Sequence, residues 1–179
     1  MPRQPVNSNL GAKHKYMKIN SARESIFQLK KSLPEVFSAT EIIYAFGESR
    51  PNIGDDSNEE FRGCLGGNDI GEESGLYIFS SENDEIIYIG KATKDNLHER
   101  VWDHLGTPKR LENGWMTFPK TKFNSRESLE LTTSIINGNI KLHVFTVSDP
   151  DVVSVIEVYL QVMHLKEFGR LPVFNKQIG

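Results

Sequence analysis

The alternation of apolar and polar positions is clearest between residues 75 and 90. Two apolar runs, residues 76–79 and 86–89, flank a polar cluster at residues 81–84. Short runs rich in Ile, Tyr and Phe around a polar turn predict a β-hairpin. Because side chains alternate between the two faces of a strand, Tyr77 and Tyr88 can lie on a shared surface.

A helix is predicted directly after the hairpin and Lys91. Asp95 is a favourable N-cap residue, so we expect the helix to begin near it. Its buried stripe is formed by apolar residues spaced four apart, which are Leu97, Val101 and Leu105. Arg100 and His104 are also four apart and share a neighbouring face. Such a pair beside an exposed tyrosine is suited to binding a phosphate, although an isolated Arg/His pair is more often a solvated basic face.

A longer helix is predicted after a third strand at residues 141–147. Asp149 supplies a capping acceptor and Pro150 occupies the first helical position. Gly169 is a natural stop, so this helix covers residues 151–168.

The middle of this helix contains one acidic residue in an apolar setting. Residues 152–160 are apolar nearly all round the helix, and Glu157 is the exception. A carboxylate there is costly to bury unless it is paired or bound to a metal ion. The residues alone leave open a structural ion pair with an arginine and a metal ligand.

The first 74 residues carry weaker signals. Residues 1–20 have few apolar positions and predict a flexible basic arm. Residues 21–33 and 34–46 predict two helices, although residues 38–41 also allow a break and a fresh helix start. Residues 47–74 predict an acidic, turn-rich connector.

Several of these residues occur along the chain in the order that is typical of one known protein family. The landmarks along the chain are Gly75-Leu76-Tyr77, Tyr88-Ile89-Gly90, Arg100 with His104, Glu157, and Asn175 after Pro172 and Phe174. On these landmarks the chain resembles the GIY-YIG nuclease superfamily from residue 75 to residue 175. Leu76 replaces the central isoleucine, which is a swap between aliphatic side chains of similar volume.

The resemblance implies an α+β fold in which a three-stranded antiparallel sheet is flanked by helices. The order of strands and helices predicted from the pattern agrees with it. Residues 75–179 would form the GIY-YIG nuclease domain. Residues 1–74 would form an N-terminal extension made of the basic arm, two helices and the connector.

The resemblance also implies the catalytic residues. They would be Tyr77, Tyr88, Lys91, Arg100, His104, Glu157 and Asn175. Glu157 would hold one divalent cation, Mg²⁺ or Mn²⁺, together with waters and phosphate. Arg100 would bind the phosphate through its guanidinium.

The remaining roles concern proton transfer. Tyr77 is the first choice for general base, and the positive charge of Lys91 could help it to accept a proton. Tyr88 and His104 would position the water or the phosphate, and Asn175 would support the site. The division of roles among Tyr77, Tyr88 and His104 stays open.

Composition restricts the class of protein. The 179 residues suffice for one domain with its own core. The single cysteine, Cys64, excludes an intramolecular disulfide framework and fits a reducing compartment. The first residues do not resemble a signal peptide, and no apolar run approaches the roughly 20 residues that span a bilayer. We therefore expect a cytoplasmic protein with no membrane partner.

The formal net charge of −3 is unusual for a protein that binds nucleic acid, but the charges are unevenly distributed. Residues 1–31 and 106–126 are basic, whereas residues 32–74 are acidic. Local positive charge steers a polyanion more than total charge does. Residues 106–126 follow the helix with Arg100, so we expect them to bind DNA through Lys109, Arg110, Lys120, Lys122 and Arg126. Residues 125–131 allow a short helix.

We therefore expect a divalent-metal-dependent endonuclease that hydrolyses phosphodiester bonds of double-stranded DNA. A stand-alone restriction- or defence-type enzyme suits this small chain, because repair incision subunits and homing endonucleases normally carry a further DNA-binding domain after the nuclease. The alternatives are a DNA repair or recombination incision nuclease and a non-catalytic nucleic-acid-binding module of the same fold. Homo-oligomerisation stays open.

Overall fold

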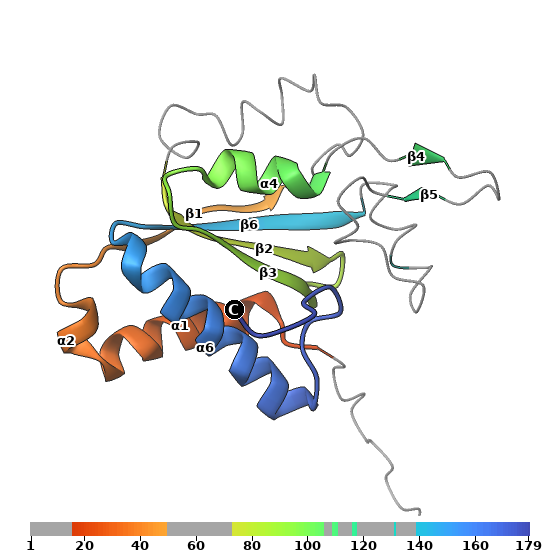
Figure 1. Cartoon of the computed structure of the whole chain (residues 1–179). Helices are drawn as coiled ribbons and strands as arrows, with labels where there is room; N and C mark the ends of the chain where they lie inside the picture. Colours follow the sequence, from red (N-terminus) through yellow and green to blue (C-terminus); the bar gives the residue numbers. More distant parts are fainter. Residues whose placement is uncertain (1–15, 50–72, 106–108, 111–115, 118–130, 132–138) are drawn as a thin grey trace, which may run out of the picture.

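The computed structural model describes residues 16–49, 73–105, 109–110, 116–117, 131 and 139–179 (Figure 1). Helices and strands of unequal length follow one another along these segments. In chain order they are α1 (Ile19–Ser32), α2 (Pro34–Phe37), β1 (Ile42–Ser49), β2 (Gly75–Ser81), β3 (Ile86–Ala92), α4 (Leu97–Leu105), β4 (Lys109–Arg110), β5 (Met116–Thr117), β6 (Ile140–Val147) and α6 (Pro150–Phe168).

Four of the described strands form one antiparallel sheet in the order β1-β6-β2-β3. β2 lies inside it, where Ile78 pairs with Ile89 of β3 on one side and with His143 of β6 on the other. The sheet has one strand more than the three we expected, because β1 pairs with β6. Gly75 is required where β2 passes β6, since a Cβ there would overlap the carbonyl oxygen of Phe145.

Helices cover both faces of this sheet, so the chain has an α+β fold (Figure 1). α4 packs on one face, where its Leu97 and Val101 join a buried cluster with Tyr77 and Phe79. α1 and α6 pack on the other face. The cluster on that side includes Ile26, Leu29, Ile156 and Leu160 of the helices and Leu76, Ile78 and Phe145 of the strands. Burial on both faces explains why β2 is an almost continuous apolar run.

The predicted hairpin is confirmed, and the residues before α1 are tied to its turn. Asp84 has a φ of 62°, a left-handed conformation that aspartate tolerates. Its carbonyl oxygen accepts a hydrogen bond of 3.0 Å from Ile19 N. The flexible arm predicted at residues 1–20 is therefore wrong at its C-terminal end, where Met17 is buried. Residues 1–15 lie outside the described part of the chain.

The helix after the hairpin is present, but Asp95 is not the residue before it. α4 begins at Leu97, directly after Asn96. The Asp95 carboxylate accepts a hydrogen bond of 2.9 Å from the Ser74 hydroxyl, and Asp95 has a φ of 50°. Leu97 and Val101 are fully buried as predicted. The third member of the predicted stripe has no described side chain.

The second helix predicted near the N-terminus, at residues 34–46, is wrong over most of its length. α2 ends at Phe37, the break that the sequence allowed lies at residues 38–41, and β1 in place of a fresh helix begins at Ile42. β-Branched and aromatic side chains such as Ile42, Ile43 and Tyr44 favour a strand when a partner strand is available. β6 supplies that partner, which a short irregular apolar run does not reveal.

The long C-terminal helix agrees with its prediction at both ends. The Asp149 carboxylate accepts a hydrogen bond of 3.0 Å from Asp151 N, and Pro150 is the first helical residue. Gly169 ends the helix with a φ of 72° and donates to Leu165 O at 2.8 Å. Neither this helix nor any other in the described segments is long and apolar enough to cross a bilayer.

The described part of residues 1–74 belongs to the same layers as the rest. α1 packs against α6, and β1 pairs with β6. The boundary that we placed between residues 74 and 75 stays a prediction. Residues 50–72 of the predicted connector and residues 125–130 of the predicted short helix lie outside the described residues.

Candidate active site

The two motif tyrosines lie together on the face of the sheet that α4 covers. Tyr77 of β2 pairs with Gly90 of β3, and Tyr88 precedes Gly90 on the same strand. The ring centroids of the two tyrosines are 6.0 Å apart. Tyr77 is fully buried, and Tyr88 is 8 % exposed. The predicted shared surface is confirmed, but it is a buried surface rather than an exposed one.

Gly90 provides the space that Tyr77 occupies. A Cβ at position 90 would overlap the Tyr77 ring and lie 2.6 Å from its hydroxyl oxygen. The Tyr77 ring therefore lies against the backbone of β3, which only a residue without a side chain permits. This contact is a steric reason for the glycine that ends Tyr88-Ile89-Gly90.

α4 places His104 against both tyrosines. His104 Nε2 lies 2.8 Å from the Tyr77 hydroxyl in a buried hydrogen bond. The His104 ring centroid is 4.9 Å from that of Tyr88. In the tautomer that carries its proton on Nδ1, His104 accepts this bond and Tyr77 donates it. These three side chains, which the resemblance assigns to one site, are therefore neighbours in the structure.

The ionisation of both tyrosines is shifted by their surroundings. Burial raises the pKa of Tyr77 above its ordinary value, and the neighbouring Tyr88 raises it further. Burial likewise raises the pKa of Tyr88. The charge of Glu157 raises, and that of Arg100 lowers, the pKa of both tyrosines. Tyr77 therefore keeps its proton at neutral pH and shares one electrostatic environment with the two charged residues.

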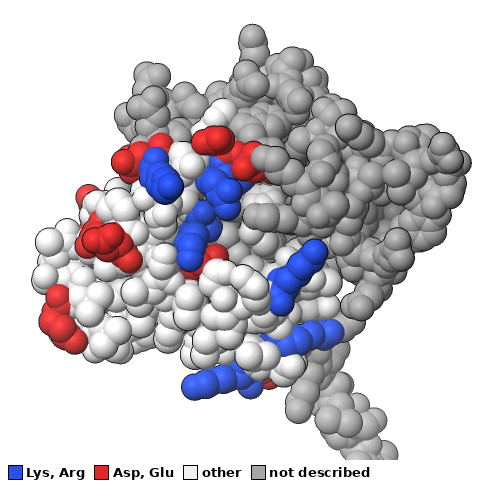
Figure 2. All heavy atoms as spheres, viewed as in Figure 1, with Lys and Arg blue, Asp and Glu red and all other residues white. Residues whose placement is uncertain are grey.

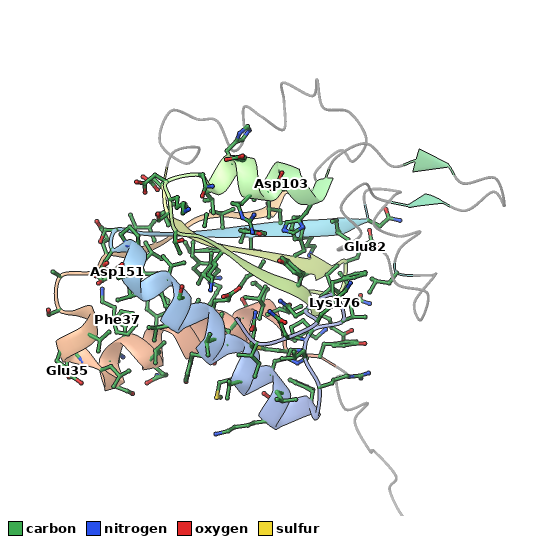
Figure 3. The ribbon with its side chains drawn as sticks, viewed as in Figure 1. Glu35, Phe37, Glu82, Asp103, Asp151 and Lys176 are labelled. Atoms are coloured by element: carbon green, nitrogen blue, oxygen red, sulfur yellow. The ribbon has the colours of Figure 1, made fainter. Side chains whose placement is uncertain are left out.

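Arg100 lies at the solvent side of this cluster, with 38 % of its side chain exposed. Its Nη1 is 3.6 Å from Oδ2 of Asp103, which Figure 3 labels on α4. Exposed ion pairs of this kind contribute at most about 1 kcal/mol. A phosphate can therefore replace Asp103 as the partner of the guanidinium at little cost, because bidentate phosphate bonds are stronger.

Lys91 and Glu157 form an ion pair across β3 and α6, two elements that pack together. Lys91 Nζ lies 2.8 Å from Glu157 Oε2. Glu157 is 5 % exposed, so the structural ion pair considered from the sequence is present, with a lysine in place of an arginine. The expected role of Lys91 beside Tyr77 changes accordingly, because the positive charge that lowers the Tyr77 pKa is that of Arg100.

Glu157 offers a divalent cation a single buried carboxylate, which is paired with Lys91. Apart from its ionic contact with Lys91, Oε2 has no hydrogen-bond partner among the described residues. The described residues contain no group of three or more His, Cys, Asp or Glu side chains that could hold a metal ion. Mg²⁺ nevertheless keeps several waters and is often bound by one or two carboxylates together with phosphate. Glu157 would be the described protein ligand of such an ion.

Asn175 forms hydrogen bonds to the edge strand β3, which carries Tyr88 and Lys91. Its Oδ1 accepts from Ile89 N at 2.9 Å, and its Nδ2 donates to Ile89 O at 2.8 Å. Phe174 N donates to Ile87 O at 3.1 Å. The segment after α6 therefore bonds to the outer edge of β3 beside Tyr88. This geometry agrees with the supporting role that we expected for Asn175.

The predicted DNA-binding residues are described only in part. Lys109 and Arg110 form β4, which pairs with β5. Lys120, Lys122 and Arg126 lie outside the described residues. On the face in Figure 2, the described Lys and Arg side chains form a broken band across the middle and lower part, with acidic side chains at its left and upper margins.

Sequence reasoning missed a buried polar network that joins β6 to its two neighbouring strands. His143 of β6 lies with Nδ1 2.7 Å from the Tyr44 hydroxyl and Nε2 2.9 Å from the Ser80 hydroxyl. Arg23 of α1 lies over the Tyr44 ring, 4.3 Å from its centroid. Ser80 was the sequence feature that could have indicated this network, because a polar residue in an apolar strand needs a buried hydrogen-bond partner.

A pocket of about 190 Å³ lies away from these residues. Its lining includes the acidic residues Glu41, Glu73 and Asp95 together with Ser74 and Ser148. None of the predicted catalytic residues lines it, so the pocket does not contribute to the candidate site.

No protein-family model, no curated protein and no solved structure matches this chain. The functional interpretation therefore depends on the motif residues and on the geometry that brings them together.

Proposed function

We propose that the chain is a divalent-metal-dependent endonuclease of the GIY-YIG type that hydrolyses phosphodiester bonds of double-stranded DNA. The observation that carries the proposal is the 2.8 Å hydrogen bond between the Tyr77 hydroxyl and His104 Nε2, within the electrostatic reach of Arg100 and Glu157. Hydrolysis needs a proton acceptor for water, positive charge at the phosphate and a cation site. This cluster contains residues suited to each task.

The finer fold assignment belongs to the same proposal. β6, β2 and β3 with α4 and α6 correspond to the nuclease core that the resemblance implies. α1, α2 and β1 are then an N-terminal extension that adds a strand to the sheet. We assign the enzyme to the restriction or defence type, with repair or recombination incision as the alternative.

His104 is the base in this proposal, and Tyr77 passes the proton to it. The raised pKa of Tyr77 opposes a free phenolate, but the Tyr77 hydroxyl already donates to His104. The attacking water gives a proton to the Tyr77 oxygen while Tyr77 gives its own proton to His104 Nε2. The products are hydroxide, a neutral tyrosine and an imidazolium. Tyr88 packs against both rings and keeps them in place.

Arg100 and Glu157 act on the phosphate side of the reaction. The Arg100 guanidinium binds non-bridging phosphate oxygens, and this contact strengthens as negative charge develops in the transition state. Glu157 would hold the divalent cation, which would supply Lewis-acid stabilisation of the negative charge that develops at the phosphate. Asn175 holds β3 in place through its two hydrogen bonds to Ile89.

The duplex is held by backbone phosphate contacts outside this cluster. The residues that we assign to these contacts are Lys109, Arg110, Lys120, Lys122 and Arg126. Phosphate contacts of this kind provide affinity without sequence specificity.

A non-catalytic nucleic-acid-binding module of the same fold is the second candidate. Two observations favour it, namely the full burial of Tyr77 and the pairing of Glu157 with Lys91. Such a module would bind duplex DNA in a salt-dependent manner and leave it intact in the presence of Mg²⁺.

Incubation with supercoiled plasmid separates the two candidates. In Mg²⁺ we expect nicked and linear products, which disappear with EDTA. Glu157→Gln and Tyr77→Phe should each lower the cleavage rate by at least about a hundredfold, because each removes one group required for the chemistry. Glu167→Gln, an equivalent change at an exposed position of α6, is the matched control and should cleave like the parent. Binding without cleavage by the parent chain would support the non-catalytic module instead.

A further inference from the structure

The Lys91 ammonium binds the Glu157 carboxylate, which is also the group that would bind the cation required by the proposed nuclease. Glu157 is the one carboxylate among residues 152–160 of α6, and only 7 % of its side chain is exposed. Its Oε2 lies 2.8 Å from Lys91 Nζ. Apart from this ionic contact, the oxygen has no hydrogen-bond partner among the described residues. The lysine is thus the counter-ion that makes burial of this carboxylate tolerable.

The two partners differ in their freedom to move. Glu157 lies in the middle of a 19-residue helix whose neighbouring Val153 and Ile156 are fully buried. Lys91 lies near the end of the edge strand β3, and 31 % of its side chain is exposed. A lysine side chain has a flexible four-carbon stem, so its ammonium can leave toward solvent without moving the backbone. Any exchange at Glu157 therefore requires movement of Lys91 rather than of Glu157.

We propose that Lys91 is an internal competitor of the divalent cation, so that the ammonium and the metal ion occupy Glu157 in turn. The inference rests on the proposed function, because it concerns the regulation of that cation site. A single buried carboxylate balances one positive charge. Adding a divalent cation beside the ammonium would leave two excess positive charges in a poorly solvated place. The cation therefore displaces Lys91, and the released ammonium becomes available to the substrate phosphate.

Direct measurement of Mn²⁺ binding tests this competition without any reaction. Free Mn²⁺ is quantified by electron paramagnetic resonance in titrations of the parent chain, Lys91→Met and the matched control Lys94→Met. Lys94 is exposed three residues further along. Removing the competitor should tighten Mn²⁺ binding by about tenfold or more, because the binding-competent state is no longer a minor one. Lys94→Met should bind like the parent.

Further variants keep the test decisive if Lys91→Met folds poorly. Lys91→Gln can donate a hydrogen bond to Glu157 without a charge, and it should also bind Mn²⁺ more tightly than the parent. Lys91→Arg retains a cation and should bind Mn²⁺ like the parent. Adding Mn²⁺ should raise the melting temperature of Lys91→Met more than that of the parent, since tighter binding stabilises the folded state more.

Equal or weaker Mn²⁺ binding in both neutral Lys91 variants would overturn the inference. If the parent still cleaved DNA in Mg²⁺ and Glu157→Gln did not, the proposed function would stand without it. If neither the parent nor the Lys91 variants bound Mn²⁺ in a manner that Glu157→Gln abolishes, and no cleavage occurred, the proposed function itself would fail. The two failures are therefore distinguishable.

Discussion

The position of the Tyr77 side chain is fixed by its contacts with three neighbouring residues. Gly90 leaves room for the ring, and His104 binds the hydroxyl. Phe79 contacts the ring edge-on, with centroids 6.2 Å apart. Interiors are close-packed, so a side chain bounded in this way cannot easily adopt another position. The position of the hydroxyl is therefore a property of the surrounding residues.

Substituting Gly90 by alanine should test this packing. The added Cβ would overlap the Tyr77 ring, which is fully buried and cannot swing away. Overpacking of this kind typically costs about 1–3 kcal/mol of unfolding free energy, which urea denaturation would measure. The double variant Gly90→Ala with Tyr77→Leu should be destabilised by less than the sum of the two single variants. Parental stability of Gly90→Ala would show that the ring position is not constrained.

Arg100→Lys should be nearly inactive although it retains the charge. A point ammonium cannot reproduce the planar guanidinium fork, and removing one preorganised anion-binding group typically costs about a hundredfold in rate. Plasmid cleavage at saturating DNA gives the measurement. Arg170→Lys, far along the chain after α6, is the control. A rate within a few-fold of the parent would show that Arg100 is a surface charge with no role in the reaction.

At the scale of elements, β1, β6 and β2 are joined by side chains as well as by backbone pairing. His143 of the inner strand β6 bonds to Tyr44 of β1 and Ser80 of β2. Lys141 of β6 contacts Asp84 at 2.7 Å, in the turn between β2 and β3. Buried polar networks of this kind are favourable only while every member keeps its partner. Protonation of His143 would disturb this one.

The stability of the fold should consequently depend on His143 in acid. Burial lowers the pKa of His143 to about 4, below its ordinary value of 6.5. Between these two values the unfolded chain binds a proton that the folded chain does not, so stability falls as the pH decreases. The decrease should reach roughly 3 kcal/mol at pH 4 relative to pH 7.

Urea denaturation at several pH values would measure this decrease. His143→Gln offers hydrogen-bonding groups that do not titrate, and its stability should vary less across the same pH range. His98→Gln, on α4, is the control and should follow the parent. An identical pH dependence in His143→Gln and the parent would contradict the assignment.

At the scale of the whole molecule, the candidate site lies where the two faces of the sheet meet at the β3 edge. The face under α4 carries Tyr77, Tyr88 and His104. α6, which covers the other face, supplies Glu157, and Lys91 of β3 reaches it. β3 lies at one edge of the sheet, so groups from both faces can approach the same ligand there.

DNA binding by a chain with a net charge of −3 should depend on the basic segment 106–126. Neutralising Lys109, Arg110, Lys120 and Lys122 together should weaken binding and lower the slope of log affinity against log salt by about one unit for each phosphate that the variant no longer binds. Fluorescence anisotropy with duplex DNA at several salt concentrations gives this slope. Cleavage at saturating DNA should partly survive, because Glu157 is unaffected.

A matched control for this experiment replaces four exposed lysines elsewhere, at positions 31, 94, 166 and 176. Its salt slope should equal that of the parent. Removing residues 1–15, which leaves the buried Met17 in place, should act in the same direction as the four-site variant but more weakly, since those charges belong to the predicted N-terminal arm. An unchanged slope in the four-site variant would refute this placement of the DNA.

Local features of the sequence were sufficient for several elements. The β2–β3 hairpin, the strand β6 and the long helix α6 with its Asp149 cap and Gly169 end all follow from short-range pattern and capping chemistry. Strand alternation was also sufficient to predict that Tyr77 and Tyr88 share a face of the hairpin. That His104 belongs to the same site was implied by the resemblance rather than by the local pattern.

Only the tertiary structure decided the features that depend on a distant partner. Residues 42–49 form a strand because β6 offers an unpaired edge, and the strand propensity of Ile42, Ile43 and Tyr44 does not by itself exclude a helix. The pairing of Lys91 with Glu157 joins residues far apart in sequence, and so does the network around His143. A buried polar group takes whichever partner the fold brings within reach, so its partner is set by packing rather than by its neighbours in the chain.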